Sequence, residues 1–412
     1  MGGGANPPSH LGGKMESLCD TDFYKLTMMQ VVLHQYAGTW VRYAFKWRNW
    51  NECKDQLRIS PKDFIGRLKD KLDKLCALRF RQEELEYLAS IPYLKPDFIE
   101  YLRLFQLNRA HIHPYVEDEE IKIKIEGPWI STILFEVPVL AIVSQLYTES
   151  CKNYTVNLYS EGRKRNSEKV EFLKTAVHRE QKFMFSDFGT RRRASHEWHW
   201  ETIDFYRQNV PEMLVGTSNV LMAKELGLKV IGTMAHEYLQ AHQQLGPRLV
   251  DSQKAALQAW ANEYRGELGI ALSDVLGFRA FLKDFDRYFA LLFDGCRHDS
   301  GDPIWWGEEL IAHYKKLRID PRTKSAVFSD GLTFETAVDI FRRFSSRINT
   351  GFGIGTYLTN DIGLVAPQIV IKMTYCNDKP VAKVSDSPGK GMCEDTGFLT
   401  YLHQVIEEKI SG

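Results

Sequence analysis

The spacing of apolar residues predicts an α+β module over residues 15–150. The stretch SLCDTDFYKLTMMQVVLHQY has the spacing of a helix. Its apolar face consists of Leu26, Met29, Val32 and Leu33, and its candidate N-caps are Asp20, Thr21 and Asp22. A strand is predicted at Val41–Trp47 and charged helices over residues 60–106. Alternating apolar and polar residues over 108–126 predict half-buried antiparallel strands.

From Lys182 onward, the chain repeats a unit in which a short apolar strand ends in small and polar residues and is followed by a helix. The seven strand ends are FMFSDFGTRR, MLVGTSN, KVIGTMAHE, IALSD, DGCRHDSGDP, AVFSDGL and INTGFGIGT. This alternation predicts parallel strands with right-handed crossovers. Polar residues at every strand end favour an α/β barrel, with the active site on that face, over a doubly wound open sheet. We assign residues 151–365 to the barrel domain.

The two ends of the chain and its longest apolar run complete this organisation. Residues 366–412 contain IVIKMTYCNDKPVAKVSD, which predicts a hairpin around Asn377-Asp378 that rejoins the N-terminal sheet. Residues 1–14 lack an apolar signal core and are expected to be a disordered leader. Polar residues and a proline interrupt the apolar run Trp129–Tyr147, which favours a buried core helix over a membrane span.

Composition limits the partners and the compartment. Lysine and arginine together number 53, as do aspartate and glutamate, so the net charge is zero. This balance gives no general attraction to nucleic acid or to anionic membranes, and any anion site must be local. The seven cysteines are scattered and form no CxxC motif. Such cysteines indicate reduced thiols in an intracellular, cytoplasmic protein rather than a disulfide framework or a zinc site.

The turn after the strand in KVIGTMAHEYLQ carries the most reactive side chain of the series, His236, beside Glu237. An imidazole at this place can accept a proton, bind a metal or carry a phosphoryl group. The next histidine, His242, is six residues on, so the spacing of a zinc protease is absent. The sequence HEWH, residues 196–199, has a spacing that metal ligands can use, but no third ligand is evident.

The other strand ends indicate a site for a phosphorylated sugar. FGIGT, residues 352–356, is a glycine-rich turn whose backbone amides can approach a phosphate. RHDSGDP places the cation Arg297 beside Asp299 and Asp302, which suits an anion together with hydroxyl groups or a bound Mg²⁺. FGTRRR adds Arg191 to Arg193, and we expect at least one of these arginines to be solvated or structural.

The order of these motifs resembles that of the nicotinate phosphoribosyltransferase family. The matching motifs are DTDFYKLTM, FSDFGTRR, GTSN, GTMAHE, RHDSGDP, FSDGL, FGIGTYLTND and VAKVSDSPGK. They cover nearly all the chain after the leader. The resemblance implies a type II phosphoribosyltransferase fold, an irregular α/β barrel beside an N-terminal sheet domain that the C-terminal strands complete. It also implies that the protein joins nicotinate to phosphoribosyl pyrophosphate, coupled to ATP hydrolysis, in the salvage of NAD.

The resemblance implies roles for the residues that match the family's motifs. His236 matches the histidine that the family phosphorylates from ATP, and Asp274 in IALSD matches the carboxylate that orients it. Tyr24 and Phe188 are expected to sandwich the pyridine ring. Asp299 is expected at the ribose hydroxyls. The remaining groups expected at the substrate are Arg191, Arg297, Ser218 and Thr233, with Gly353, Gly355 and Thr356 at the 5′-phosphate. Mg²⁺ is expected with the phosphates rather than at a metal site of the protein.

Two features qualify the resemblance. After Asp274 the family continues with a threonine-rich stretch, whereas this chain has Val275-Leu276-Gly277-Phe278. In several relatives the counterpart of Tyr24 comes from a neighbouring subunit, so the resemblance leaves open whether the protein is a monomer or a homodimer.

Rival interpretations remain at this point. Nicotinamide phosphoribosyltransferase carries an aspartate at the position of Ser218, and that aspartate would repel the carboxylate of nicotinate, so Ser218 favours the acid as substrate. Quinolinate, with two carboxylates, requires a more basic site. A phosphohistidine carrier or an interaction protein on the same barrel needs only the histidine, so the intact ring, ribose and phosphate motifs count against it.

Overall fold

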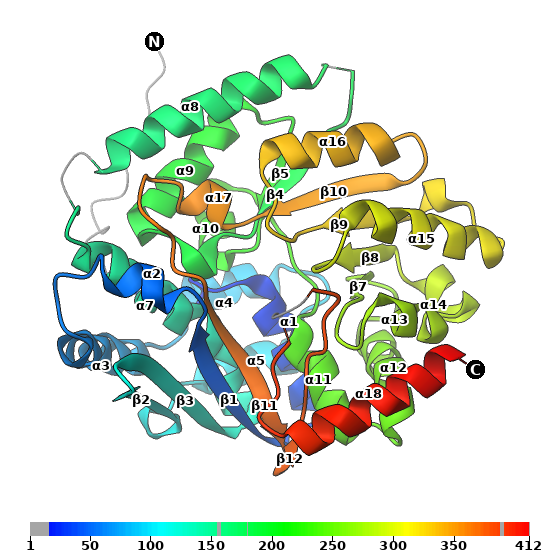
Figure 1. The fold of residues 1–412 in the computed structure, drawn as a ribbon, viewed down its shortest axis with the longest axis horizontal. Coiled ribbons are helices and arrows are strands. Elements are labelled where there is room, and N and C mark those ends of the chain that lie inside the picture. The colour runs from blue at the N-terminus through cyan, green and yellow to red at the C-terminus, as the bar shows by residue number, and fades with distance from the viewer. Residues whose placement is uncertain (1–15, 155–157, 179, 388–390, 412) are drawn as a thin grey trace.

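The computed structural model describes residues 16–154, 158–178, 180–387 and 391–411 and contains two sheets (Figure 1). The larger sheet has seven strands, in the order β6-β5-β4-β10-β9-β8-β7, and every pairing in it is parallel. Its strands are β4 (Phe185–Asp187), β5 (Leu214–Thr217), β6 (Lys229–Val230), β7 (Ile270–Leu272), β8 (Gly295–His298), β9 (Ser325–Phe328) and β10 (Asn349–Ile354). These are the seven predicted strand units, each present. The predicted leader, residues 1–14, lies outside the described residues.

Helices follow the parallel strands and cover the outside of the curled sheet (Figure 1). They are α9 (His196–Asn209), α10 (Val220–Leu226), α11 (His236–Leu245), α12 (Ser252–Tyr264), α13 (Phe278–Asp284), α14 (Arg287–Leu292), α15 (Pro303–Lys316), α16 (Phe334–Phe344) and α17 (Thr356–Thr359), with α8 (Leu158–Ala176) before them. Side-chain caps set several helix starts, since Ser195, Asn219 and Asp302 accept hydrogen bonds from backbone amides of the first turn.

The predicted barrel is a half-barrel that stays open between its edge strands, β6 and β7. The edges are bridged by side chains instead of by a strand ladder. Thr233, after β6, donates its hydroxyl to the carbonyl oxygen of Ile270 in β7 at 2.8 Å. Thr27 in turn donates to the carbonyl oxygen of Thr233 at 2.6 Å. An irregular α/β barrel is therefore confirmed, with the first helix bonded to the segment that follows β6.

The smaller sheet is antiparallel and joins the two ends of the chain. Its order is β12-β11-β1-β3-β2. Its strands are β1 (Trp40–Trp47), β2 (Ile112–Glu117), β3 (Glu120–Pro128), β11 (Ile369–Cys376) and β12 (Lys379–Pro380). Asn377 and Asp378 have φ values of 49° and 58°, the left-handed conformation of a two-residue hairpin turn. The predicted C-terminal hairpin and its return to the N-terminal sheet are confirmed.

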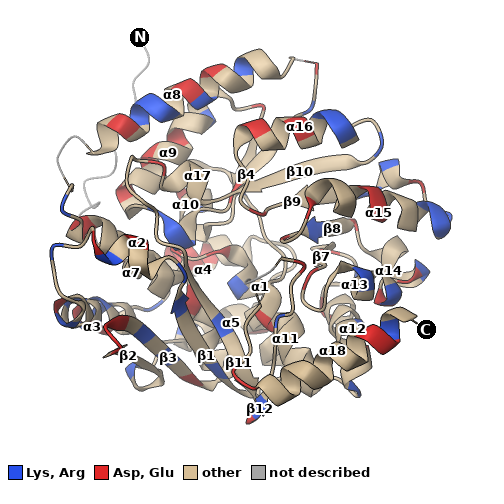
Figure 2. Ribbon diagram, in the orientation of Figure 1, with Lys and Arg blue, Asp and Glu red and all other residues tan. Residues whose placement is uncertain are grey.

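The remaining helices surround this sheet and supply the core beneath it. They are α2 (Trp50–Lys54), α3 (Pro61–Ala77), α4 (Gln82–Ala89), α5 (Pro96–Leu104), α6 (Trp129–Thr132), α7 (Glu136–Ser150) and the C-terminal α18 (Thr396–Ser411). The segment Trp129–Ser150 is long and apolar enough to cross a membrane, but 94% of its most apolar window is buried inside the protein. The prediction of a buried core helix is confirmed. Lysines and arginines are interspersed with acidic residues along the outer helices in Figure 2, as the zero net charge suggests.

Helix α1 (Phe23–Gln35) lies at the centre of the molecule, between the two sheets (Figure 1). It is buried on all sides from Phe23 to Val32, so its burial extends well beyond the predicted apolar face of Leu26, Met29, Val32 and Leu33. The helix begins after Asp22, whose side chain makes no capping hydrogen bond. The reason is that the Asp22 carboxylate accepts a hydrogen bond from the hydroxyl of Ser218, in a different part of the chain.

The segment before α1 is tied to the end of β5. The Phe23 amide donates to the Ser218 carbonyl at 2.7 Å, and the Val220 amide donates to the Thr21 carbonyl at 3.0 Å. The buried Asp20 carboxylate accepts hydrogen bonds from both terminal nitrogens of the buried Arg193 guanidinium, at 2.7 and 2.5 Å. This bidentate pair fixes where the N-terminal segment enters the half-barrel.

We predict that Asp20→Ala lowers the free energy of unfolding by about 3–5 kcal/mol, because it leaves the Arg193 guanidinium buried without its counter-ion. The double variant Asp20→Ala/Arg193→Met removes both charges and is expected to lose less. Urea unfolding followed by circular dichroism measures both. Equal losses in the two variants would show that the pair does not act as a unit.

Candidate active site

A cavity of about 340 Å³ opens where the strands of the half-barrel end. Its walls come from the segments that follow β4, β5, β6, β8, β9 and β10, and from the start of α1. Of the residues predicted from the sequence, those that line it are Tyr24, Phe188, Arg191, Ser218, His236, Arg297, Asp299, Gly355 and Thr356. Gly353, Thr233 and Asp274 do not line it. The predicted strand-end residues therefore converge on one site.

Two glycines make room for the aromatic side chains at one end of the cavity. A Cβ on Gly353 would lie 2.4 Å from the Phe188 ring, so Gly353 accommodates that ring within β10 rather than facing the cavity. A Cβ on Gly232 would lie 3.0 Å from the Tyr24 backbone nitrogen, and Gly232 has a φ of 150°. Both residues line the cavity of their own chain.

Ser218 has a neighbour that the sequence motifs did not reveal. Its hydroxyl donates to Asp22 Oδ1 at 2.7 Å, and both residues are buried and line the cavity. Burial raises the pKa of Asp22, although Arg191 and the Ser218 hydrogen bond oppose that rise. A carboxyl group therefore already lies beside Ser218, and the serine presents its oxygen rather than a free hydroxyl proton while Asp22 is ionised.

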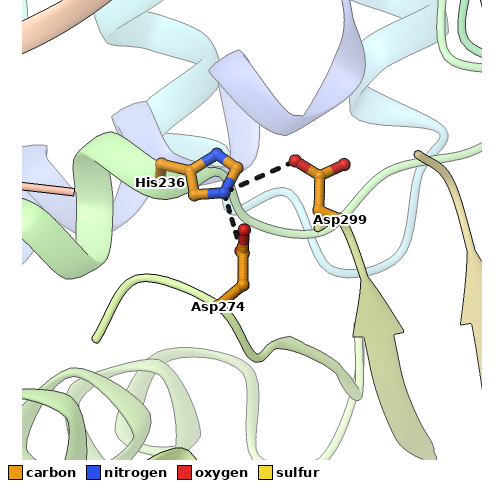
Figure 3. Close-up of side chains that lie close together, drawn as sticks. All are labelled: His236, Asp274 and Asp299. Atoms are coloured by element: carbon orange, nitrogen blue, oxygen red, sulfur yellow. Dashed lines mark hydrogen bonds and ion pairs between the residues drawn. The ribbon is translucent and has the colours of Figure 1, made fainter. Parts of the chain in front are cut away.

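His236, at the start of α11, is paired with two carboxylates (Figure 3). Its Nε2 lies 2.8 Å from Asp274 Oδ1 and 3.4 Å from Asp299 Oδ2. Burial, followed by the nearby Lys383 ammonium, lowers the pKa of His236 below its ordinary value although Asp274 acts in the opposite direction. The imidazole is therefore neutral at pH 7, with Nε2 as its N–H donor toward Asp274 and Nδ1 left with a lone pair.

Asp274 is held by partners that lie far from it in the sequence. Its Oδ2 accepts a hydrogen bond from the Ser300 hydroxyl at 2.7 Å and forms an ion pair with the Lys383 ammonium, also at 2.7 Å. The chain departs from the family's motif at Val275–Phe278, and this stretch forms hydrogen bonds through its backbone. The Val384 amide donates to the Val275 carbonyl, and the Phe278 amide donates to the Asp386 carboxylate. Ser300 and Lys383 thus provide the polar contacts that the departure left unidentified.

Glu237 follows His236 but faces away from the cavity. It is buried, and its carboxylate lies 3.0 Å from the Lys25 ammonium, which also lies 2.5 Å from Glu136. Glu136 in turn lies 3.5 Å from a terminal nitrogen of Arg191. Sequence adjacency therefore gave a misleading pair: Glu237 belongs to a buried charge cluster that joins α1, α7 and α11 behind the cavity wall.

The arginine triplet divides between two roles. Arg191 and Arg192 line the cavity, whereas Arg193 is buried in its pair with Asp20. The expectation that at least one of the three is structural is confirmed. Burial, together with the neighbouring Arg191 and Arg48, lowers the pKa of Arg192 to about 10. Both cavity arginines therefore remain charged at neutral pH, which suits an anionic ligand.

The histidines of HEWH do not form a metal site. His196 Nδ1 lies 3.1 Å from Asp20, and His199 Nε2 lies 2.7 Å from Asp187, so each imidazole serves a different buried carboxylate. Within the described ranges, the group with metal-binding spacing is His236, Asp274 and Asp299. The Lys383 ammonium on Asp274 already neutralises one of these carboxylates.

Sequence reasoning missed several cavity residues. They are Asp22, Gly189, Gly232, Ala235, Ser329, Gly331, Leu332, Thr333 and Tyr357. Most lie within or beside the quoted strand-end motifs, so extending FSDGL and FGIGT by a residue or two would have found Thr333 and Tyr357. Asp22 gave no such signal, because its place beside Ser218 depends on a contact across 196 residues.

A curled parallel half-barrel, an antiparallel sheet formed from both chain ends and a strand-end histidine–carboxylate pair define a type II phosphoribosyltransferase. Two family models match the chain: the nicotinate phosphoribosyltransferase (NAPRTase) N-terminal domain over residues 19–144 and the nicotinate phosphoribosyltransferase (NAPRTase) family over residues 183–410. The chain belongs to the nicotinate phosphoribosyltransferase family.

Individual relatives agree with this assignment. The nicotinate phosphoribosyltransferase of Xanthomonas campestris pv. campestris (strain B100) is 51% identical over 399 residues, covering 95% of this chain and 96% of that protein. The enzyme of Xylella fastidiosa (strain 9a5c) is 51% identical over 395 residues, or 95% and 98% of the two chains. Among solved structures, the enzyme from Vibrio cholerae superimposes with a TM-score of 0.89 at 37% identity, and the match covers 98% of this chain and 96% of that chain. The enzyme from Porphyromonas gingivalis superimposes with a TM-score of 0.86 at 30% identity, and the match covers 95% of this chain and 99% of that chain.

We predict that Glu237 makes stability pH-dependent. Burial raises the pKa of Glu237 from 4.5 to about 7, so the folded protein keeps this proton at pH values where the unfolded chain has released it. The contribution of this group to stability is therefore full below pH 4.5 and is lost as the pH rises through 7. Urea midpoints at pH 5 and pH 8 should converge in Glu237→Gln relative to the unmodified protein. Identical pH slopes in both proteins would contradict this assignment.

Proposed function

We propose that this protein joins nicotinate to 5-phosphoribosyl 1-pyrophosphate, giving nicotinate mononucleotide and pyrophosphate, with ATP hydrolysis coupled through a phosphohistidine. Family membership supports the transfer reaction. The single observation that supports the coupling is the geometry of His236, which lies 2.8 Å from Asp274 and lines a cavity together with the residues expected at the substrates.

In the proposed ground state, the pyridine ring lies between Tyr24 and Phe188, where stacking orients it without charge. Arg191 and Arg297 face the carboxylate of nicotinate and the phosphates of the second substrate. Asp299 accepts hydrogen bonds from the ribose hydroxyls. The backbone of Gly355 and Thr356 meets the 5′-phosphate. A Cβ on Gly355 would lie 3.1 Å from the Phe188 carbonyl oxygen, a tighter contact than most Cβ atoms make, so glycine suits this close approach.

In the coupling step, the Nδ1 lone pair of His236 attacks the γ-phosphorus of ATP. The bond between that phosphorus and the bridging oxygen breaks, ADP leaves, and a phosphorus–nitrogen bond forms. The imidazole keeps its proton on Nε2, so the ring becomes cationic, and the Asp274 carboxylate stabilises that charge as it does in other histidine–carboxylate pairs. The lowered pKa of His236 keeps the attacking nitrogen unprotonated at pH 7.

In the transfer step, the pyridine nitrogen displaces pyrophosphate directly. Loss of pyrophosphate develops positive charge on the ribose, so stabilisation comes from groups that hold the leaving group and the nearby oxygens rather than from a protein nucleophile. His236 is committed to phosphorus and Asp299 to the hydroxyls. We therefore propose inversion at the anomeric carbon.

Mg²⁺ fits this site as a companion of the phosphates. Asp299 is the carboxylate that would face it, because Asp274 is occupied by His236, Ser300 and Lys383. When bound, Mg²⁺ would neutralise phosphate charge.

All seven cysteines, each within the described part of the chain, are free thiols, which supports the proposal that the enzyme works in the cytoplasm.

One experiment separates this function from its rivals. Purified protein is incubated with phosphoribosyl pyrophosphate and ATP, and either nicotinate or nicotinamide, and the products are separated by chromatography. We expect nicotinate mononucleotide, with ADP and pyrophosphate in its presence. Nicotinamide mononucleotide as the preferred product would identify the amide enzyme instead, and ATP labelling of the protein without any mononucleotide would indicate a phosphohistidine carrier.

We predict that His236→Ala abolishes labelling of the protein from γ-labelled ATP but keeps a slow, ATP-independent transfer. The reason is that this substitution leaves intact the residues expected to bind the pyridine ring and the 5′-phosphate. Asp299→Ala is expected to lose far more transfer activity, with or without ATP, since it removes a contact to the reacting sugar. Steady-state rates of both variants with and without ATP measure this difference. Label retained in His236→Ala, or near-full activity in Asp299→Ala, would contradict the scheme.

We predict that Ser218→Asp weakens nicotinate relative to nicotinamide by roughly 1–3 kcal/mol, because a carboxylate there faces the carboxylate of the substrate. Asp22 is already 2.7 Å from the Ser218 oxygen, so Ser218→Asn is the matched control that adds volume without a second charge. The ratio of kcat/KM for the two substrates measures the preference. An unchanged ratio in Ser218→Asp would place Ser218 away from the substrate's carboxylate.

A further inference from the structure

Lys169 of α8 is a buried cation outside the cavity, with a side chain only 6% exposed. Its ammonium donates a hydrogen bond to the carbonyl oxygen of Tyr357 at 2.6 Å and pairs with Asp361 Oδ2 at 2.8 Å. The same nitrogen lies 3.9 Å from the centroid of the Tyr357 ring, a cation–π contact. Burial lowers the pKa of Lys169, so these contacts replace hydration that the ammonium has lost.

All three contacts fall on the segment that follows β10. Tyr357 lines the cavity directly after Gly355 and Thr356. Asp361 lies just beyond the end of α17, so Lys169 holds both the beginning and the end of this segment. On the opposite side, the Thr359 hydroxyl donates to the Gly189 carbonyl at 2.9 Å. The segment is therefore clamped between α8 and the loop after β4.

The two anchor points of Lys169 differ in how replaceable they are. Asp361 also pairs with Arg165 of the same helix, so it keeps a cationic partner when Lys169 is removed. The Tyr357 carbonyl receives its hydrogen bond from Lys169, whereas the Tyr357 ring also packs edge-on against Phe334, with centroids 5.8 Å apart, and its hydroxyl donates to Glu335 at 3.3 Å. Loss of the ammonium therefore removes the hydrogen bond that anchors the backbone of the cavity-lining residue, and leaves the carboxylate paired.

We infer that Lys169 is a positioning residue for the 5′-phosphate of phosphoribosyl pyrophosphate, an inference that rests on the proposed function. Lys169 acts through Tyr357, by holding the backbone of Gly355 to Tyr357 in one conformation before the phosphate arrives. A segment that is already ordered loses less conformational freedom on binding, and the affinity for the phosphate is correspondingly higher. At the ring end of the cavity, Tyr24 lies on α1, and the Phe188 amide donates to the Ile354 carbonyl of β10 at 2.8 Å, so both ring residues have anchors outside the segment that Lys169 holds.

The test compares Lys169→Met with Lys164→Met. Methionine at position 169 keeps the apolar part of the side chain and removes the charge. Lys164 lies on the same helix, its side chain is 69% exposed, and its ammonium lies 3.9 Å from the Glu168 carboxylate. We expect Lys169→Met to raise the KM for phosphoribosyl pyrophosphate about tenfold, which corresponds to about 1.4 kcal/mol. The KM for nicotinate at saturating phosphoribosyl pyrophosphate should stay within about twofold, and Lys164→Met should behave as the unmodified protein.

Lys169→Arg restores a charged donor that can also stack on Tyr357, and it should recover most of the affinity. If Lys169→Met does not fold, Lys169→Gln supplies a neutral donor and should give a smaller rise of the same KM. A lowered melting temperature with an unchanged KM for phosphoribosyl pyrophosphate would reduce Lys169 to a structural clamp and overturn the inference. An equal rise in the KM of both substrates would overturn it as well.

Calorimetric titration with phosphoribosyl pyrophosphate separates this inference from the proposed function. Unmodified protein that binds this ligand but forms no nicotinate mononucleotide would overturn the proposed function alone. Equal binding by the unmodified protein and Lys169→Met would overturn the role of Lys169 alone. Unmodified protein that binds no phosphoribosyl pyrophosphate would overturn both.

Discussion

An open parallel sheet has two edges whose backbone groups need partners, and the way in which this protein closes that gap determines the rest of its structure. Helix α1 is bonded to the segment that follows the edge strand β6. It donates from Thr27 to the Thr233 carbonyl, and its Thr27 carbonyl accepts from the Tyr264 hydroxyl. The Ala235 amide lies 3.3 Å from the sulfur of Met28. These bonds bring the first turn of α1 to the strand ends, where Tyr24 lines the cavity.

Charges buried beside α1 follow from the same placement. A helix that is surrounded by protein has no solvated face, so each charge near its start requires a counter-ion in the core. Asp20 has Arg193, and Lys25 has Glu136 and Glu237. These pairs join the N-terminal segment to elements from both halves of the chain, and the cavity residues stand between them. The site is therefore assembled from segments that would separate if α1 were displaced.

Much of this organisation could be predicted from local patterns. Seven strand ends rich in small and polar residues indicated a parallel sheet with its chemistry on one face, since the ends of parallel strands meet there. Nine of the predicted site residues line the cavity for that reason. Two features were not visible in these patterns: the burial of α1 extends beyond its predicted apolar face, and Glu237 pairs with Lys25 although it follows His236 in the sequence. Both depend on neighbours from elsewhere in the chain.

By itself, the sequence determined the elements, their order, the parallel arrangement and the identity of the strand-end groups, because these depend on residues close together in the chain. Only the tertiary structure decided which partners those groups have. Ser218 meets Asp22 across 196 residues, Lys383 meets Asp274 across more than a hundred, and Lys169 meets Tyr357 across 188. The physical reason is that a buried charge or hydroxyl takes the nearest complementary group in space, and spatial proximity is set by how the layers pack.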